Sequence, residues 1–174
     1  MPVIILYIAT SQDLFIADKT GSVGFLDSIN EWALEHKQDF GYPALLDRCD
    51  TIVMGRKTYE QVCSFGPWPY GDFTTYVLSE NSIDPENQSV IFVNSFEKLL
   101  KKVETTAKKD VWLCGGAQII VLFDRAKMID EIILTKLSLL LSDGIPLIIN
   151  WNNYLKVKEV VYDDQAVQIT YKKV

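Results

Sequence analysis

The chain has 174 residues, of which 48% are hydrophobic and 23% are charged, and its formal net charge is −6. This size fits one domain, residues 1–174, whose hydrophobic core is large enough to be stable without disulfides or bound metal. The composition excludes disorder and collagen-like repeats. The acidic charge and single histidine argue against nucleic-acid binding, and no apolar run reaches the ~18 residues of a membrane-spanning helix. The three cysteines lack metal or redox spacing, so we expect no metal site, reduced thiols and a cytoplasmic protein.

The first half of the chain alternates apolar runs with helical patterns. Residues 3–10 are rich in β-branched side chains and predict a buried first strand. Ser28 followed by Glu31 predicts a capped helix that stops at Gly41. Three strands are predicted next, at residues 50–54, 73–78 and 90–93, with a helix beginning near Thr58 after the first of them.

The second half continues the alternation and then changes character. A capping pattern at Asn94 and Glu97 predicts an amphipathic helix. The remaining predicted elements are a strand at 111–114, a buried helix at 117–123, a strand at 132–137, and a hairpin of 155–162 with 166–171. We therefore predict an α/β fold, with a mostly parallel sheet of about eight strands, helices on both faces and an antiparallel C-terminal hairpin.

Three predicted turns lie at the carboxyl ends of strands, where parallel sheets gather their ligands. They are Gly55-Arg56, Ser79-Glu80 and Gly115-Gly116. The first and third open helices, whose free N–H groups and positive dipole ends suit phosphates. Neither a Walker loop nor the G-x-G-x-x-G fingerprint is present. The turns fit a dinucleotide that carries an additional 2′-phosphate, and plain capped helices are the alternative.

Two motifs resemble the dihydrofolate reductase superfamily. IVMGRKTYE at 52–60 is similar to its strand-to-helix signature, and WLCGGAQII at 112–120 is similar to its Gly-Gly signature. Two further stretches, IATSQDLFIADKTGSVGFL at 8–26 and IDEIILTKL with LSDGIPLI within 129–148, are more similar to the C-terminal reductase domain of the bacterial bifunctional riboflavin-biosynthesis enzyme and its stand-alone relatives. The resemblance spans nearly the whole chain and implies a three-layer dihydrofolate-reductase-like fold.

The resemblance also implies that the cofactor is NADPH. Arg56, Lys57 and Thr58 would meet its 2′-phosphate and pyrophosphate region. Leu78 and Ser79 would flank the adenine ribose. Glu80 stands beside the expected 2′-phosphate, and an inward carboxylate there would make NADH competitive, whereas a solvent-facing one would not.

The rest of the implied cofactor site lies at the other two strand ends. Ala9 and Ile16 would contact the nicotinamide. The remaining residues of the implied site are those at which the backbone and helix starts approach the ligand: Gly55, Cys114, Gly115, Gly116, Ala117 and Gln118. In the superfamily a cis peptide often joins the two glycines of the second signature. NADPH carries the hydride, and the protein positions its ring against the substrate.

Three residues are candidates for binding the substrate or delivering a proton to it. Asp39 stands where dihydrofolate reductases place their pterin-binding acid, and Thr135 stands where its partner threonine would be. Asp13 is the rival acid, in a stretch that lies near the substrate in the riboflavin branch. Leu14 replaces the glycine of that stretch, which puts the riboflavin-pathway substrate in doubt.

The sequence leaves several functions open. The leading one is an NADPH-dependent reductase of a nitrogen heterocycle or ribosylaminopyrimidine, similar to 5-amino-6-(5-phosphoribosylamino)uracil reductase. Dihydrofolate, or an unassigned pterin- or flavin-like compound, is the alternative substrate. A non-catalytic NADPH-binding module is the alternative class. The resemblance implies a homodimer and a small-molecule substrate, with no nucleic-acid or membrane partner.

Overall fold

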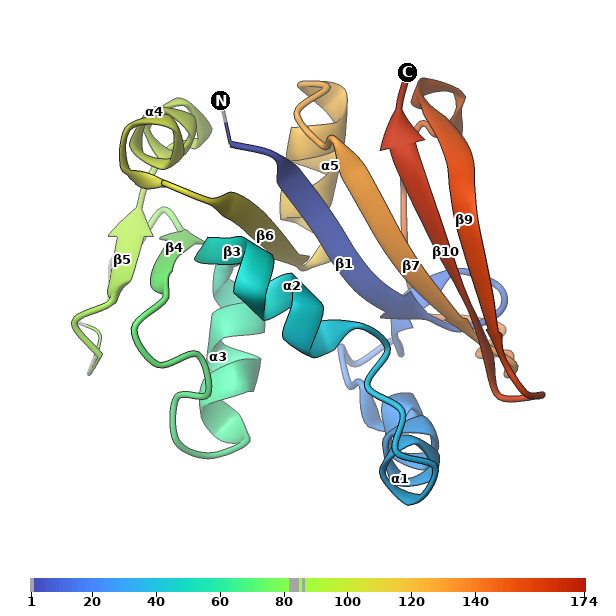
Figure 1. The fold of residues 1–174 in the computed structure, drawn as a ribbon. Coiled ribbons are helices and arrows are strands. Elements are labelled where there is room, and N and C mark those ends of the chain that lie inside the picture. Colours follow the sequence, from blue (N-terminus) through green and yellow to red (C-terminus); the bar gives the residue numbers. More distant parts are fainter. Residues whose placement is uncertain (1, 82–84, 86) are drawn as a thin grey trace.

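The computed structural model describes residues 2–81, 85 and 87–174 (Figure 1). Its strands are β1 (Ile4–Thr10), β2 (Phe15–Ala17), β3 (Cys49–Gly55), β4 (Thr74–Leu78), β5 (Val90–Val93), β6 (Asp110–Gly115), β7 (Glu131–Leu137), β8 (Ile145–Pro146), β9 (Tyr154–Tyr162) and β10 (Ala166–Lys173). Its α-helices are α1 (Asp27–Glu35), α2 (Tyr42–Arg48), α3 (Arg56–Ser64), α4 (Phe96–Thr106) and α5 (Ala117–Arg125). Short 3₁₀ turns span Gly24–Leu26 and Trp151–Asn153.

Eight strands form the central sheet in the order β5-β4-β3-β6-β1-β7-β10-β9. All neighbours from β5 to β7 pair in parallel, and β10 pairs antiparallel with both β7 and β9. The predicted α/β class, the mostly parallel eight-stranded sheet and the C-terminal hairpin are therefore confirmed. The carboxyl ends of the six parallel strands share one edge, which is where the predicted glycine turns meet.

Helices cover both faces of the sheet and make three layers (Figure 1). On one face α4 and α5 bury Leu99 and Phe123 against strand residues such as Leu113. On the other face α2 and α3 cover a second cluster that includes Leu45 and Trp112. A third cluster packs α1 against β7 and β10. Fully burying one such aliphatic side chain stabilises the fold by roughly 1.5–3 kcal/mol.

Three features of the fold differ from the sequence prediction. The helix over residues 42–48 was not predicted, because Gly41 was interpreted as a stop and is instead the residue that opens α2, with φ of +76°. The small β2–β8 sheet was also not predicted. The third difference is in the capping: Ser28 caps nothing, because a 3₁₀ turn leads straight into α1, and Ser95 rather than Asn94 caps α4.

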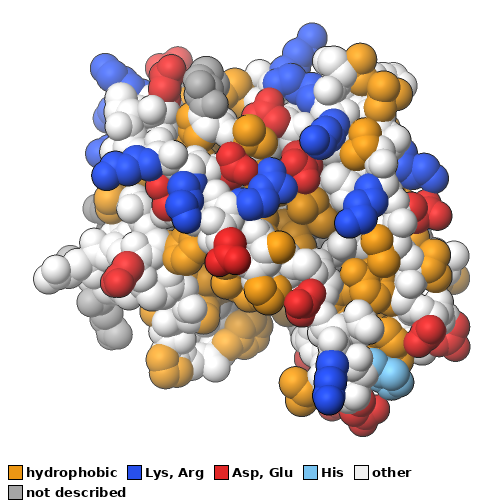
Figure 2. All heavy atoms as spheres, in the orientation of Figure 1, with side chains coloured by type: hydrophobic (Ala, Val, Ile, Leu, Met, Phe, Trp, Pro, Cys, Tyr) orange, Lys and Arg blue, Asp and Glu red, His pale blue; other side chains and the backbone are white. Residues whose placement is uncertain are grey.

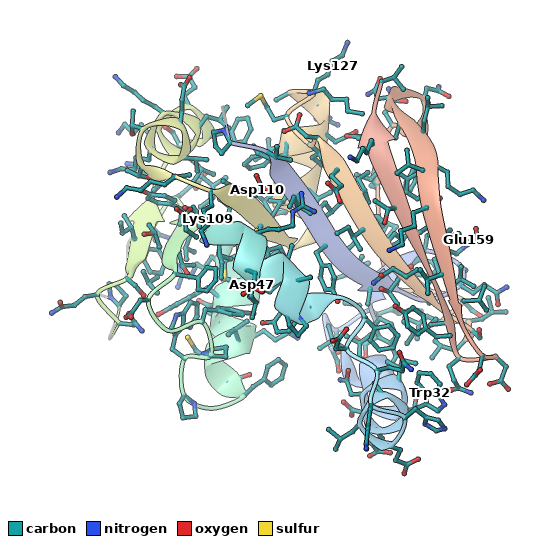
Figure 3. All side chains as sticks on the ribbon, viewed as in Figure 1. Trp32, Asp47, Lys109, Asp110, Lys127 and Glu159 are labelled. Atoms are coloured by element: carbon teal, nitrogen blue, oxygen red, sulfur yellow. The ribbon has the colours of Figure 1, made fainter. Side chains whose placement is uncertain are left out.

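Ion pairs fix α2 to the amino ends of two central strands. The Arg48 guanidinium donates to both oxygens of Glu131 at 3.1 Å and to Asp110 Oδ2 at 3.1 Å. Lys109 Nζ donates to the Asp47 carbonyl at 3.0 Å, and Figure 3 shows Asp47, Lys109 and Asp110 grouped beside the helix. Figure 2 shows basic and acidic side chains interspersed over this face.

Arg48→Met is expected to lower the free energy of unfolding by about 1–3 kcal/mol. The substitution keeps the apolar stem and leaves Glu131, which is 8% exposed, without its bidentate partner. We expect a smaller loss than for a fully buried ion pair, because the Arg48 side chain is 39% exposed. Urea unfolding at pH 7 measures the change. Arg48→Met in a Glu131→Gln background is the control, and an equal loss there would contradict the role of the charge pair.

Candidate active site

The two signature turns lie side by side. Strands β3 and β6 are parallel neighbours, and Met54 is in register with Gly115. A side chain at Gly55 would place its Cβ 3.9 Å from the Gly115 oxygen and from the Gly116 nitrogen. A Cβ at Gly116 would lie 3.3 Å from Thr58 Oγ1. The absence of side chains at these glycines therefore leaves a strip of backbone between the starts of α3 and α5.

This strip has the properties of a phosphate cradle. Helix α3 begins at Arg56 and helix α5 at Ala117, and neither start is capped by a side-chain hydrogen bond. Their first N–H groups are thus free to meet an anion. The Gly115–Gly116 peptide bond is cis, as the resemblance implies, and Gly115 has φ of +123°, where a side chain is disfavoured.

Cationic side chains around the first turn are only partly free. The Arg56 Nε atom donates to Glu60 Oε1 at 2.7 Å, and both side chains are partly exposed. Lys57 is exposed on α3. A phosphate at this turn would therefore compete with Glu60 for the Arg56 guanidinium.

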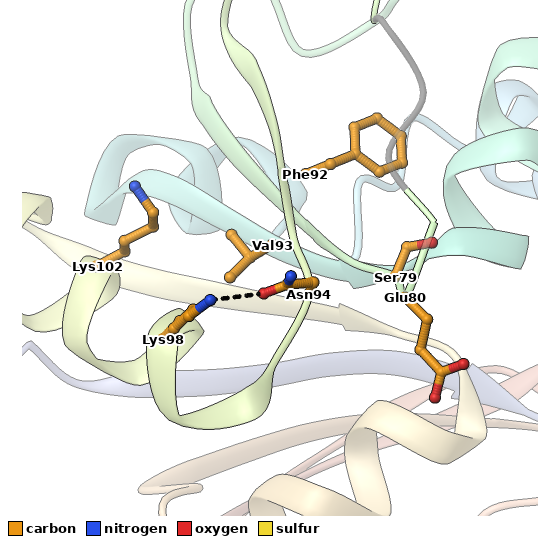
Figure 4. Close-up of a pocket in the computed structure, with 7 residues that line it drawn as sticks. All are labelled: Ser79, Glu80, Phe92, Val93, Asn94, Lys98 and Lys102. Atoms are coloured by element: carbon orange, nitrogen blue, oxygen red, sulfur yellow. Dashed lines mark hydrogen bonds between the residues drawn. The ribbon is translucent and has the colours of Figure 1, made fainter.

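A cavity of about 250 Å³ opens beyond the ends of β4 and β5 (Figure 4). It is lined by Ser79, Glu80, Phe92, Val93, Asn94, Lys98 and Lys102. The Ser79 amide donates to the Val93 carbonyl at 2.9 Å, and Lys98 Nζ donates to Asn94 Oδ1 at 3.1 Å. Glu80 lines this cavity, but it is exposed, and Figure 4 shows its carboxylate directed away from Lys98 and Asn94. Leu78 lies in the same strand end, one residue before Ser79.

The loop after β1 carries the expected nicotinamide contacts. Ala9 lies near the end of β1, and Ile16 lies in β2, which pairs with β8. Leu14 adopts φ of +66°, the left-handed backbone conformation that favours glycine. The Leu14 carbonyl accepts from the Leu147 amide at 2.8 Å.

Asp13 fastens this loop to the segment before β8. Its carboxylate accepts from the amides of Leu141 at 3.2 Å and Ser142 at 2.8 Å. Hydrogen bonds from Ser11 and from these two amides hold the pKa of Asp13 below its usual range. Asp13 is consequently placed to hold the loop, whereas Asp39 lines a cavity, and this difference in position favours Asp39 among the two candidate acids.

Asp39 and Thr135 are brought to one region by residues that the sequence analysis did not single out. The Gln168 Nε2 atom donates to the Phe40 carbonyl at 2.8 Å and to Thr135 Oγ1 at 2.9 Å. The Tyr7 hydroxyl donates to the same carbonyl at 3.2 Å. The turn that carries Asp39 is thus attached to β1 and β10 of the sheet.

A second cavity, of about 300 Å³, opens beside this turn. Its lining combines aromatic rings with polar groups: Tyr7, Asn30, Ala33, Leu34, Gln38, Asp39, Phe40 and Tyr42. Burial raises the pKa of Tyr7, and the charge of Asp39 is among its further causes. Burial followed by the charge of Asp39 likewise raises the pKa of Tyr162. The charge of Asp39 therefore acts on two tyrosines of this region, and aromatic walls of this kind suit a planar ring.

Aromatic side chains continue from this cavity toward the second signature. Trp112 makes edge contacts with Tyr7, Tyr42 and Tyr70, with ring centroids 5.3–6.3 Å apart. The Trp112 Nε1 donor is buried and has no partner among the described residues. No single motif predicted this cluster, because its members come from four separate segments.

The cysteines are expected to react with iodoacetamide at very different rates. Burial raises the pKa of both Cys49 and Cys114 to about 12, so at pH 8 these thiols stay protonated and unreactive. Cys63 is exposed. Peptide mapping after brief alkylation at pH 8 should find label on Cys63 alone, and on all three cysteines in urea. Rapid labelling of Cys114 in the folded protein would contradict its assigned environment.

Metal and membrane features are not found in the described part of the chain. Among residues 2–81, 85 and 87–174, no group of three or more His, Cys, Asp or Glu side chains is arranged to hold a metal ion. None of the helices described there has the length and apolar character that crossing a bilayer requires.

Comparison with known proteins decides the family. A family model described as dihydrofolate reductase matches residues 16–173. The chain belongs to the dihydrofolate reductase family. It is 33% identical over 171 residues to the uncharacterised Bacillus subtilis protein YwjB, and the match covers 96% of this chain and 95% of that protein. It is 27% identical to the dihydrofolate reductase of Mycoplasma genitalium over 86 residues, 48% of this chain and 51% of the other.

Two solved structures are similar to this fold over nearly the whole chain. A protein of Shewanella sp. PV-4, provisionally assigned to riboflavin biosynthesis, superposes with a TM-score of 0.83 at 30% identity and covers 99% of both chains. Dihydrofolate reductase of Enterococcus faecalis, in complex with NADP(H) and RAB-propyl, superposes with a TM-score of 0.68 at 21% identity. It covers 98% of this chain and 96% of its own, and at this identity it supports the fold alone.

Proposed function

We propose that this member of the dihydrofolate reductase family is an NADPH-dependent reductase of a planar nitrogen heterocycle. The observation that carries the proposal is the side-by-side position of the two signature turns, with free helix starts and no Cβ atoms at Gly55 and Gly116. These residues fit a pyrophosphate lying against backbone. When bound, NADPH supplies the hydride.

The residues of the chain then have two separate roles: one group binds the cofactor, and another group binds the heterocycle. Arg56, Lys57 and Thr58, with Gly115 to Gln118, bind the phosphates, and the cavity at Ser79 takes the adenosine. Ala9 and Ile16 orient the nicotinamide. Asp39 and Thr135 hold the heterocycle, and Asp39 is the group that helps a proton reach it. Tyr7 and Tyr42, which pack on Trp112, give the substrate cavity an apolar wall that disfavours water beside the reacting ring.

Among substrates we propose a ribosylaminopyrimidine phosphate first. The DGIPL stretch at 143–147 and the likeness to the Shewanella protein over 99% of both chains support this choice. Dihydrofolate is the second candidate, and the link from Asp39 to Thr135 through Phe40 and Gln168 favours it. A non-catalytic NADPH-binding module would bind the cofactor and reduce neither compound.

Cofactor titration tests the binding half of this proposal. NADPH is expected to quench tryptophan fluorescence with a lower dissociation constant than NADH. Arg56→Ala should weaken NADPH about tenfold, because a charge-assisted bond to the 2′-phosphate is lost, and should leave NADH unchanged. Glu60→Gln should strengthen NADPH, because it frees the Arg56 guanidinium.

Lys101→Ala is the matched control, since Lys101 is an exposed cation of α4 that does not line the adenosine cavity. Equal affinity for both nucleotides in every variant would contradict the assignment of Arg56. Absence of binding by either nucleotide at millimolar concentration would overturn the reductase proposal.

A further inference from the structure

Gln168, Thr135 and Ala9 form a row across the sheet. Gln168 of β10 pairs with Thr135 of β7, and Thr135 pairs in turn with Ala9 of β1. Residues paired in this way project from the same face of a sheet. Thr135 is 6% exposed, so its hydroxyl has little access to bulk water. Its neighbour on one side is a long amide, and on the other side a methyl group beside the proposed nicotinamide position.

The direction of the hydrogen bonds in this row is fixed by chemistry. The Phe40 carbonyl can only accept, so the amide nitrogen of Gln168, and not its oxygen, must face it. The second hydrogen of the same nitrogen points to Thr135 Oγ1 at 2.9 Å. Thr135 therefore accepts from Gln168 and keeps its own hydroxyl hydrogen to donate. No acceptor for that hydrogen is found in the part of the chain that the structure describes.

The same amide fixes the turn that carries the candidate acid. Phe40 has φ of +52°, a strained backbone for a bulky residue, and its carbonyl is held by both Gln168 and Tyr7. Asp39 Oδ1 accepts from the Gly41 amide at 2.8 Å, which sets the carboxylate at the rim of the aromatic cavity. One glutamine thus connects a fixed acceptor, Asp39, with a fixed donor, Thr135.

We propose that Gln168 is a positioning residue, which holds the Asp39 acceptor and the Thr135 donor in place for a heterocycle whose edge carries an N–H donor next to a carbonyl oxygen or unprotonated ring nitrogen. The donor of that edge meets the Asp39 carboxylate, and the acceptor meets the Thr135 hydroxyl. This inference rests on the proposed function, which supplies the roles of Asp39 and Thr135, and it adds Gln168 as the residue that positions both. In the opposing view, Gln168 only fastens the turn to β10 and has no influence on ligand choice.

Equilibrium binding to the protein saturated with NADP⁺ separates the two views without requiring turnover. The probes are dihydrofolate and 5-amino-6-(5-phosphoribosylamino)uracil, both of which carry such an edge. Gln168→Met and Thr135→Val are each expected to raise the dissociation constant of a bound probe about tenfold, the cost of one lost hydrogen bond. The double variant should lose little more than either single one, because both changes act on the same donor.

Conservative variants supply the readout that a purely structural role would not give. Thr135→Ser keeps the hydroxyl and should bind the probe within about threefold of the unaltered protein. Gln168→Glu is nearly isosteric, but its carboxylate repels the Phe40 carbonyl and accepts the Thr135 hydrogen, so probe binding should weaken at pH 8. Binding should recover toward pH 5, where the introduced carboxyl group begins to take up a proton and can donate again. Thr170→Val, two residues further along β10 on the same face, is the matched control and should change nothing.

The dissociation constant of NADP⁺, measured for each variant, distinguishes a failure of this inference from a failure of the proposed function. An unaltered probe affinity in Gln168→Met and Thr135→Val would overturn the inference and leave the proposed function intact. A parallel loss of probe and NADP⁺ affinity, with a lowered melting temperature, would assign Gln168 a structural role and also overturn it. Binding of NADP⁺ with no binding of either probe to the unaltered protein would reject the proposed ligand edge, and no NADP⁺ binding would reject the proposed function itself.

Discussion

Asp39→Asn is expected to lower the turnover number by at least about 100-fold, the usual contribution of a positioned acid–base group. The substitution isolates the charge, because the asparagine oxygen can still accept from the Gly41 amide and preserve the turn. The binding of NADPH should stay within about twofold, since Asp39 lies at the opposite end of the site from the signature turns. Initial rates of NADPH oxidation measure the change.

Glu35→Gln is the matched control for Asp39. Glu35 is an exposed carboxylate at the end of α1, near the cavity but outside its lining. Its removal should leave turnover unchanged. Equal rates for Asp39→Asn and the unaltered protein would transfer the proton-delivery role to another group, and the position of Asp13 in the loop contacts makes bound water the remaining candidate.

Gly144→Ala is expected to lower the free energy of unfolding by about 3 kcal/mol or more. Gly144 has φ of +154°, and a Cβ there would lie 2.3 Å from the Ala17 carbonyl oxygen. That contact is with backbone, which cannot rotate away, and Ala17 is itself in register with Ile145 in the β2–β8 sheet. The loop that carries Ile16 would have to shift. A fall in the melting temperature of roughly 6–12 °C follows for a chain of this size.

Gly21→Ala separates the clash from the cost of backbone conformation. Gly21 also has a positive φ, +87°, but a Cβ there would meet nothing within 4 Å. Its replacement should cost only about 1–2 kcal/mol, the price of a left-handed alanine. Urea unfolding of both variants gives the comparison. Equal losses would show that the Ala17 contact contributes nothing and that the DGIPL stretch tolerates a side chain.

Local patterns predicted most of the sheet. The β-branched runs at 3–10 and 50–54 became β1 and β3, and the two runs around residue 163 became the hairpin of β9 and β10. Their signals are strong because fully buried parallel strands are continuously apolar. Helix α2 was not predicted because it has only seven residues and closely follows another helix, so Gly41 was interpreted as the end of that earlier helix. β2 and β8, with three and two residues, exist through their contact with each other rather than through their own sequence.

The candidate site likewise has one part that the sequence predicted and one part that it did not. The glycine turns are local, and the sequence placed Gly55 and Gly115 at strand ends where the structure brings them together. Gln168 and its partner Phe40 are 128 residues apart in the sequence. Hydrophobic periodicity is a local pattern, so it cannot predict a hydrogen bond between such distant segments. The implied roles of the site residues stay predictions. So does the implied homodimer, for which light scattering in solution is the test.

NADPH oxidation, followed at 340 nm in a single turnover with enzyme in excess of substrate, tests the central claim most directly. The account predicts that one equivalent of NADPH is consumed per equivalent of 5-amino-6-(5-phosphoribosylamino)uracil or of dihydrofolate. It further predicts a rate that falls at least about 100-fold in Asp39→Asn. Unchanged absorbance with both compounds, in protein shown by titration to hold NADPH, would contradict the account and leave a cofactor-binding fold without reductase activity.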